Sequence, residues 1–433
     1  MHLMELPPDD VLRERLRRVD ALARNGARVK VLEAVAWPRR VEERFFAHGA
    51  GSLPEVAYDV DRDHLEERIR DCTREERALD GDDVVSAWLR ATVRSLRDAC
   101  RLVLAVGTAD FHRISKELYG GPRSRFHGGT TRNLDLAQHV LDRLRPHGRD
   151  EAADDPDESP LDAHALAEML RSRVAREYPG MDVTVVVDPD ATAKVVAGVN
   201  RVRVRADATF GHHEAEGLWH HEIGTHALTG QNGAVQEGAG LLRGGGPRST
   251  RTQEGLAVFA ELHHHCATSE RMQRLARRVV LCDMAEQGAS FLDLYRHLVD
   301  RGTAPRDAWL DAQRICRGGL LEGGAPFTKD TVYLAGLLDV QAFLSAVVRE
   351  GFRDEMELLV SGRIALEDLT ALVHLRRRGL VRRPRFLPSW LRGWRTLVAE
   401  FGFLSFLDAI ALRDVEAQYA SLIRASTEEL DRG

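Results

Sequence analysis

The side chains best suited to chemistry lie in one short segment, WHHEIGTHA, at residues 219–227. Within it His221, Glu222 and His226 form the pattern His-Glu-x-x-x-His, which combines two imidazoles with a carboxylate. Such a set can hold a zinc ion and activate a water molecule, with Glu222 taking the proton of the water as general base. The segment predicts Zn²⁺ as cofactor, with His221 and His226 as two of its ligands.

The spacing of the two histidines constrains the helix that carries them. In the common metallopeptidase pattern the histidines stand at i and i+4, on one helical face. His221 and His226 are five positions apart, which separates them by roughly 140° around a regular α-helix. A regular helix cannot aim both rings at one ion, so we expect a one-residue bulge of the π type, or a break, near Gly224.

A catalytic zinc needs a third protein ligand, and two downstream glutamates are candidates. Glu237 lies in a glycine-rich stretch with little to hold it rigid. Glu254 lies in TQEGLA, which we expect to open a helix capped by Ser249, Thr250 or Thr252. A ligand on a packed helix is better positioned than one on a glycine loop, so Glu254 is the stronger candidate.

Other acidic and imidazole side chains leave alternatives open. Glu261 lies two turns beyond Glu254 and either orients a ligand or is an exposed helix carboxylate. Glu216 and His220 form an i,i+4 pair that could itself hold a metal. We expect the remaining histidines of this region to be packing or surface residues: His212, His213, His263, His264 and His265.

Three segments together resemble a known family. HHEIGTH (220–226), TQEGLA (252–257) and PFTKDTVYLAG (326–336) look like the tyrosine carboxypeptidase-like zinc metallopeptidases. That family includes microtubule-associated tyrosine carboxypeptidases and bacterial proteins labelled "flavohemoglobin expression-modulating QEGLA motif", a label that states no chemistry. The resemblance runs from about Arg113 to Pro388 and implies a zincin-like core of the glutamate-ligand (gluzincin) type. By it, His221, His226 and Glu254 match the zinc ligands and Glu222 the catalytic base.

Peptide hydrolysis at a C-terminus needs two further groups. Tyr333 could donate a hydrogen bond to the oxyanion, or be a core tyrosine with a satisfied hydroxyl. Lys329, Arg314 and Arg317 could bind the terminal carboxylate of the substrate, or be ordinary surface charges. Asp330 could hold Lys329 or Arg317 in place. Lys329 stands out because the chain has only four lysines among its 61 basic residues.

Hydrophobic periodicity predicts a helix-dominated α+β fold with a small β-sheet. We expect an N-terminal helical region at 1–110, a catalytic domain at 111–395 and a C-terminal helical extension at 396–433. An acidic, proline-containing linker or loop is expected at 145–163. The segment RVRVRAD (201–207) is either an edge strand placed to pair with an extended peptide or an ordinary strand of the sheet.

Composition bounds the class of protein and its compartment. The 433 residues carry a net charge of −6, and 43% are hydrophobic, which is typical of a soluble globular chain without affinity for nucleic acid. No apolar run approaches the roughly 18 residues of a membrane span, and the N-terminus lacks the order of a signal peptide. The five cysteines are scattered, without a CxxC pair, so we expect free thiols and a cytoplasmic location.

The leading hypothesis is a zinc-dependent carboxypeptidase that acts on a peptide or protein C-terminus. The alternative is a non-catalytic zinc-binding regulatory protein that retains the site. A third reading, a nucleic-acid binder, rests on the arginine- and aromatic-rich segment at 374–397, and the overall acidity speaks against it. A solvated basic face is the simpler interpretation of that segment, and the oligomeric state is left open.

Overall fold

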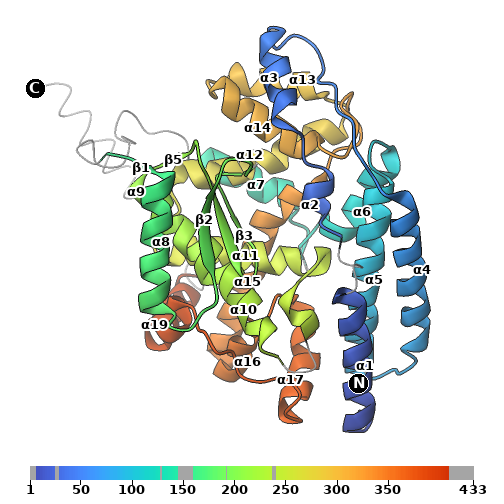
Figure 1. Cartoon of the computed structure of the whole chain (residues 1–433). Coiled ribbons are helices and arrows are strands. Elements are labelled where there is room, and N and C mark those ends of the chain that lie inside the picture. Colours follow the sequence, from blue (N-terminus) through green and yellow to red (C-terminus); the bar gives the residue numbers. More distant parts are fainter. Residues whose placement is uncertain are drawn as a thin grey trace, which may run out of the picture.

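The computed structural model describes residues 6–24, 29–126, 129–144, 159–191, 193–236 and 240–408. Helices dominate these residues and the strands are short, so the predicted helix-rich α+β class is confirmed (Figure 1). The first helices are α1 (Asp9–Leu22), α2 (Val31–Ala34), α3 (Arg39–Ala47), α4 (Arg62–Ala78), α5 (Val84–Leu104), α6 (Ala109–Tyr119) and α7 (Asn133–Arg143).

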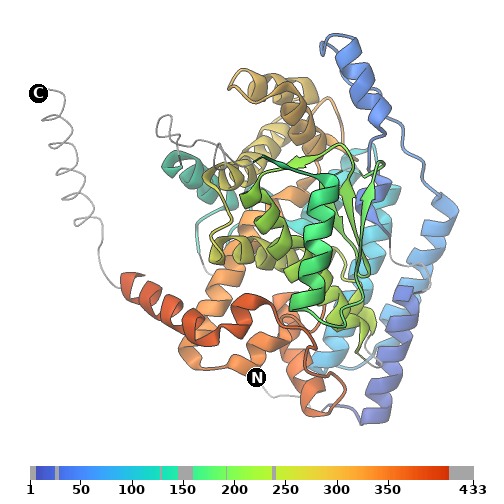
Figure 2. The same cartoon turned by 60° about the vertical axis from the view of Figure 1, so that its left-hand side comes forward.

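The strands and their helix follow. They are β1 (Leu161–Asp162), α8 (Ala163–Glu177), β2 (Thr184–Asp188), β3 (Val195–Ala197), β4 (Arg201–Arg205) and β5 (Thr209–Phe210). Three strands form a sheet in the order β2-β4-β3, with β2 parallel and β3 antiparallel to β4, while β1 pairs with β5. Helix α8 packs on the sheet, as Figure 2 shows. It buries Leu166 and Leu170 against the apolar side chains of β2 and β4.

The edge-strand prediction for residues 201–207 is wrong. β4 lies in the middle of the sheet, with β2 on one side and β3 on the other. The edge nearer the motif helix is β3, which comes from the short stretch VVA and contacts that helix. Three residues are too few to show the alternation that identifies a strand, which is why the sequence pattern favoured the longer β4.

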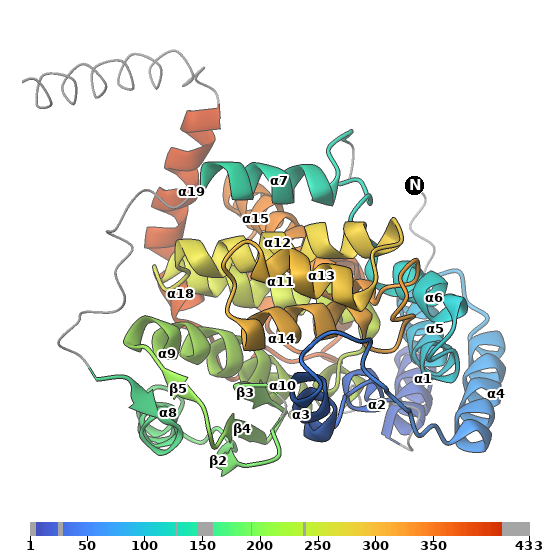
Figure 3. The ribbon, with the colours of Figure 1, turned by 90° about the horizontal axis from the view of Figure 1, so that it is seen from above.

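The second half of the chain is helical. Its elements are α9 (His212–Leu218), η2 (Trp219–Ala227), α10 (Leu228–Ala234), η3 (Gly240–Arg243), α11 (Pro247–His263), α12 (Ser269–Glu286), α13 (Phe291–Val299), α14 (Pro305–Cys316), η4 (Thr328–Thr331), α15 (Val332–Glu350), α16 (Arg353–Leu358), η5 (Leu366–Asp368), α17 (Leu369–Arg377), α18 (Ser389–Arg392) and α19 (Trp394–Asp408). Seen from above, α11 and α12 run through the centre and the strands lie to one side (Figure 3).

The largest apolar cluster joins distant parts of the chain. Leu12 and Val85 from the N-terminal helices share it with Val204 of β4 and Phe259 of α11. The N-terminal helices thus pack on the same core as the motif helices. The division of the chain at 110 and 395 stays a prediction. Most of the expected linker, residues 145–158, and the last part of the C-terminal extension, residues 409–433, lie outside the described residues.

One described segment, Thr328–Glu350, is long and apolar enough to cross a membrane by length and composition. Its sequence does not read as one continuous apolar run, because Lys329, Asp330 and Asp339 interrupt it. Half of its most apolar stretch is buried inside the protein, and α15 packs along α11. We interpret it as a core helix, because a core helix passes the same test when its apolar side chains face other helices.

Candidate metal centre

The motif helix is distorted as its spacing predicts. Residues Trp219–Ala227 form a π-helix, η2, between the α-helices α9 and α10. In a π-helix the backbone bonds from i to i+5, so residues five apart are brought towards one face. Thr225 follows the same period and donates its hydroxyl to the His220 carbonyl at 3.0 Å. The expected bulge is confirmed, and it extends over the whole motif.

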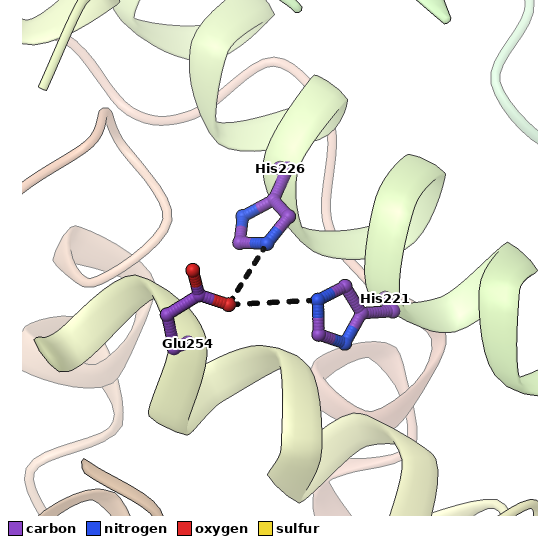
Figure 4. A group of neighbouring side chains, drawn as sticks. All are labelled: His221, His226 and Glu254. Carbon is purple, nitrogen blue, oxygen red and sulfur yellow. Dashed lines mark ion pairs between the residues drawn. The ribbon is translucent and has the colours of Figure 1, made fainter. Parts of the chain in front are cut away.

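The π-helix and α11 bring three side chains together (Figure 4). Oε2 of Glu254 lies 3.6 Å from Nε2 of His221 and 3.6 Å from Nε2 of His226. The three ligand atoms lie within 4.8 Å of one another, and the two imidazole rings meet edge to face. Two imidazole nitrogens and one carboxylate oxygen form a donor set suited to zinc, so the residues present fit a catalytic zinc site.

His221 is oriented by a second carboxylate. Its Nδ1 lies 2.6 Å from Oε1 of Glu261, and Arg271 donates to both oxygens of Glu261 at 3.0 Å. An ionised carboxylate only accepts, so Nδ1 carries the hydrogen and the lone pair of a neutral His221 lies at Nε2, facing Glu254. This is the arrangement expected around a metal-binding histidine. Glu261 is 4% exposed, so it is not the exposed helix carboxylate of the alternative interpretation.

His221 and Glu261 shift each other's pKa. Burial alone would lower the pKa of His221, but the nearby carboxylates of Glu254 and Glu261 outweigh burial and raise it to about 10. Burial would raise the pKa of Glu261, but Arg271 and His221 lower it to about 2. The side chains around His221 therefore favour positive charge at its position, as a site for a cation requires.

Glu254 comes from a regular helix that begins earlier than expected. α11 starts at Pro247 with Gly246 as its N-cap residue, so none of the three predicted caps holds that position. Ser249 contributes differently, by accepting the Gly246 N–H at 3.0 Å. Pro247 needs no N–H partner at the first helical position, which explains the earlier start. Glu254 consequently stands two turns inside the helix and is 9% exposed.

The two oxygens of Glu254 differ in their partners. Oε1 accepts a hydrogen bond from Nζ of Lys329 at 2.7 Å, whereas Oε2 is buried without a hydrogen-bond partner among the described residues. Burial acts to raise the pKa of Glu254, but Lys329 and the two histidines hold it well below its ordinary value. Glu254 is therefore an anion with one oxygen available, and that oxygen faces both histidines.

A glycine contact sets the position of α11 against α15. A Cβ placed on Gly255 would lie 2.2 Å from the carbonyl oxygen of Gly336, and a Cβ on Gly336 would lie 2.1 Å from that of Arg251. Only glycine permits this backbone approach. Gly255 follows Glu254 in TQEGLA, and Gly336 ends the segment PFTKDTVYLAG. The two glycines thus place Glu254 beside the segment that carries Lys329.

The proposed base and oxyanion donor have defined partners. Oε2 of Glu222 accepts the backbone N–H of Ala197, in the edge strand β3, at 3.0 Å. The hydroxyl oxygen of Tyr333 lies 3.1 Å from Nζ of Lys329. An ammonium only donates, so Tyr333 accepts in this contact and keeps its own proton for another acceptor.

The three cations proposed to bind the substrate carboxylate differ in how far other side chains already pair with them. The ammonium of Lys329 is engaged by Glu254 and Tyr333. Arg314 donates through both Nε and Nη2 to Asp330. Asp330 was expected to hold Lys329 or Arg317, and it holds Arg314 instead. Nε of Arg317 is buried and has no hydrogen-bond partner among the described residues. Burial and the nearby Arg314 lower the pKa of Arg317 to about 10.

The alternative metal pair does not form. Glu216 accepts from Arg173 at 2.6 Å, and His220 stacks on His264 with ring centroids 3.8 Å apart. Burial and the neighbouring His264 lower the pKa of His220 to about 3, so His220 is neutral and packed. The other candidate third ligand, Glu237, lies outside the described residues.

Three supporting contacts had no usable signal in the sequence. Arg271 is one of 57 arginines, so its type does not mark it. Ala197 acts through its backbone, and Arg363 donates Nη2 to the carbonyl of His226 at 3.0 Å, within the π-helix.

The arginine-rich segment at 374–397 forms ion pairs within the protein. Arg376 and Arg383 lie against Asp354, and Arg378 lies against Asp9. These contacts reduce the positive charge that the segment offers to a partner.

Comparison with known proteins matches most of the chain to one family model. The model, described as microtubule-associated tyrosine carboxypeptidase, matches residues 43–409. Microtubule-associated tyrosine carboxypeptidase 1 from Mus musculus is 31% identical over 169 residues, which cover 36% of this chain and 32% of the relative. The protein of the same name from Homo sapiens is 30% identical over 188 residues, 41% of this chain and 36% of the relative. The chain thus matches about a third of the length of these curated relatives.

Proposed function

Because the chain belongs to the microtubule-associated tyrosine carboxypeptidase family, we propose that it is a zinc-dependent metallocarboxypeptidase. The membership confirms the resemblance seen in the three motifs. In this proposal the core is zincin-like, His221, His226 and Glu254 hold the zinc, and the substrate is a peptide or protein C-terminus. The preference for one terminal residue is not carried over from the names of the relatives.

One observation supports the proposal above the others. The buried Oε2 of Glu254 has no hydrogen-bond partner among the described residues, yet it faces Nε2 of both histidines at 3.6 Å. A buried carboxylate oxygen without a partner is costly, and a cation bound there would remove that cost.

The residues around the site have separate tasks in the reaction. A bound zinc supplies a Lewis acid and lowers the pKa of water. Glu222, held by the Ala197 amide, accepts the proton of the attacking water and passes it to the leaving amine. Tyr333 directs its free O–H to the oxyanion that develops on the scissile carbonyl.

Arg317 is the cation we assign to the substrate carboxylate. Its two rivals are engaged, Lys329 by Glu254 and Arg314 by Asp330. Arg317 has a buried Nε without a partner among the described side chains, in a neighbourhood where Arg314 disfavours its charge. An incoming carboxylate would satisfy both the nitrogen and the charge, so the substrate must have a free C-terminus.

The test combines metal analysis with cleavage of peptide libraries. Purified protein is expected to contain about one zinc per chain, as three protein ligands imply. Wild type should shorten peptides with free C-termini and spare those with amidated C-termini, while Glu222→Gln keeps zinc and loses cleavage. The matched control is Glu214→Gln, which changes a carboxylate on α9 that pairs with Lys194. This variant should cleave normally.

Two results would overturn parts of the proposal. Zinc retention without any cleavage by wild type would favour the non-catalytic regulatory protein, and a cellular effect that survives Glu222→Gln would support the same conclusion. Cleavage of amidated and free peptides at equal rates would rule out the carboxypeptidase assignment while keeping the metallopeptidase.

We also propose a cytoplasmic location. The five cysteines are free thiols, and four of them are buried. Burial raises the pKa of Cys72 to about 11 and of Cys100 to about 12, so these thiols are unreactive. Free structural thiols are typical of a reducing compartment. Fractionation of cells that produce the protein is expected to recover it with cytoplasmic markers, and recovery with membranes or secreted protein would contradict this.

A further inference from the structure

Lys329 makes an unusual contact for a residue beside a metal centre. Its ammonium lies 2.7 Å from one oxygen of Glu254 and 3.1 Å from the Tyr333 hydroxyl, and the side chain is 5% exposed. A buried cation next to a cation site is unfavourable by Coulomb's law, and here the Glu254 carboxylate offsets that repulsion. Lys329 is also one of only four lysines in a chain with 57 arginines, so a compact ammonium is used where arginine is the common choice.

We propose that Lys329 is a positioning residue that limits Glu254 to ligating metal through a single oxygen. This inference rests on the proposed zinc site and goes beyond it by assigning the shape of the coordination. Lys329 binds Oε1, and only Oε2 is directed at His221 and His226. A carboxylate that is free to rotate can bind zinc through both oxygens and so occupy the position that a substrate or water needs.

The position of Lys329 is fixed from three directions. η4, which carries it, is joined to α15, and the contact between Gly255 and Gly336 presses α15 against the helix of Glu254. Tyr333, one turn further on, accepts from the ammonium and places its ring 4.7 Å from Nζ. The next residue, Asp330, is anchored by Arg314. These contacts hold the backbone of Lys329 beside α11 and keep its ammonium at Oε1.

Lysine and arginine would act differently at this position. A single ammonium contacts one carboxylate oxygen, whereas the planar guanidinium fork pairs with both oxygens at once. Arginine would therefore cover Oε2 as well as Oε1 and compete with the metal. A neutral side chain of similar length would release both oxygens. The two substitutions are expected to change metal binding in opposite directions.

The experiment measures zinc affinity by chelator competition in wild type, Lys329→Met and Lys329→Arg. Lys329→Met should bind zinc about tenfold more tightly or better, because a cation is removed and a second oxygen becomes available. Lys329→Arg should bind zinc about tenfold more weakly, because the fork occupies both oxygens. Lys116→Met, which removes a half-exposed lysine paired with Glu286, is the matched control and should leave the affinity unchanged.

Coordination is read directly from cobalt-substituted protein. Cobalt in wild type should give the strong visible absorption of a four-coordinate ion, and Lys329→Met should give a weaker band as a second oxygen binds. X-ray absorption of the zinc forms should show one more light ligand in Lys329→Met than in wild type. If Lys329→Met folds poorly without metal, it is produced in the presence of zinc, and Lys329→Arg keeps the charge that the fold requires.

The outcomes separate this inference from the proposed function. Weaker zinc binding in both variants, with an unchanged cobalt spectrum, would mean that Lys329 only supports the fold, and the inference would be wrong. Unchanged affinity in both variants would also overturn it. If wild type binds no zinc at this site, the proposed function fails first. Opposite shifts in the two variants, with the added ligand in Lys329→Met, would establish it.

Discussion

The two sides of the candidate centre are held in place by different means. On the histidine side, η2 deforms its backbone so that His221 and His226 face the same point. On the glutamate side, α11 stays a regular α-helix, and Glu254 is positioned by close packing against α15 and by a buried ion pair with Lys329. One side uses local backbone geometry, and the other uses contacts between segments far apart in the sequence.

The difference shows where each side should be vulnerable. The shape of η2 comes from its own backbone hydrogen bonds, so substitutions within it that fit the available space should be tolerated. A tight contact between helices has no room for a larger side chain, because protein interiors are packed as densely as organic crystals. We therefore expect the largest losses of stability on the glutamate side, and changes in metal affinity without comparable unfolding on the histidine side.

Asp330→Asn should have the largest effect. Asp330 is 2% exposed, accepts from the partly buried Arg314 and lies 3.9 Å from the buried Arg278, so its loss removes the negative charge that faces both guanidinium groups and should cost about 3–5 kcal/mol of unfolding free energy. Denaturant unfolding measures this loss. Asp354→Asn, at a carboxylate that is 60% exposed beside Arg383, is the control and should cost less than about 1 kcal/mol.

The cost of Asp330→Asn should depend on pH. Burial acts to raise the pKa of Asp330, but Arg314 and Arg278 outweigh burial and hold it below its ordinary range. A lowered carboxyl pKa stabilises the fold above the unfolded value, about 3.9, and this contribution disappears as pH falls below it. The gap between wild type and variant should be full at neutral pH and narrow in acid. A gap that widens in acid would contradict the ion pair.

Gly255→Ala should have the next largest effect. The new Cβ would lie 2.2 Å from the Gly336 carbonyl oxygen, so α11 and α15 must separate, at a cost of about 3 kcal/mol. Zinc binding should weaken in parallel because Glu254 and Lys329 are carried by these two helices. Denaturant unfolding and chelator competition measure the two effects. Gly402→Ala in α19, where a Cβ would meet nothing within 4 Å, is the control and should be neutral or slightly stabilising.

Glu261→Gln examines the histidine side. It removes the charge that pairs with Arg271 and orients Nδ1 of His221, so zinc affinity should fall by about 10- to 100-fold. Chelator competition measures the change, and Glu270→Gln, an exposed glutamate in the first turn of α12, should leave it unaltered. An unchanged affinity in Glu261→Gln would show that the π-helix alone aims His221.

Gly224→Ala should have the smallest effect. A Cβ there would lie 3.6 Å from the Trp219 carbonyl oxygen and 4.0 Å from the Tyr178 hydroxyl, which is ordinary contact. Stability should change by less than about 1 kcal/mol and zinc should remain bound. A loss like that of Gly255→Ala would mean that the π-helix depends on glycine, and the contrast between the two sides would fail.

The histidine side was largely predictable from the sequence, and the glutamate side was not. A five-residue spacing leaves few ways to aim two rings at one point, so His221 and His226 predict a π-type bulge or a break, and the structure has the π form. The contact between Lys329 and Glu254 joins residues 75 positions apart, and no periodicity reports such a pair. Arg271 and Arg363 were hidden by the abundance of arginine. The position of β4 inside the sheet was missed because β3, only three residues long, has no readable pattern.

The contact between Gly255 and Gly336 has a consequence for how related sequences can vary. At most helix contacts the two side chains can change together, because a larger side chain on one helix is compensated by a smaller one on the other. Neither glycine has a side chain to give up, so no second substitution can restore the approach that the first one blocks. Substitutions at the two positions should therefore never appear as compensating pairs. A contact central to this centre would leave no trace of covariation.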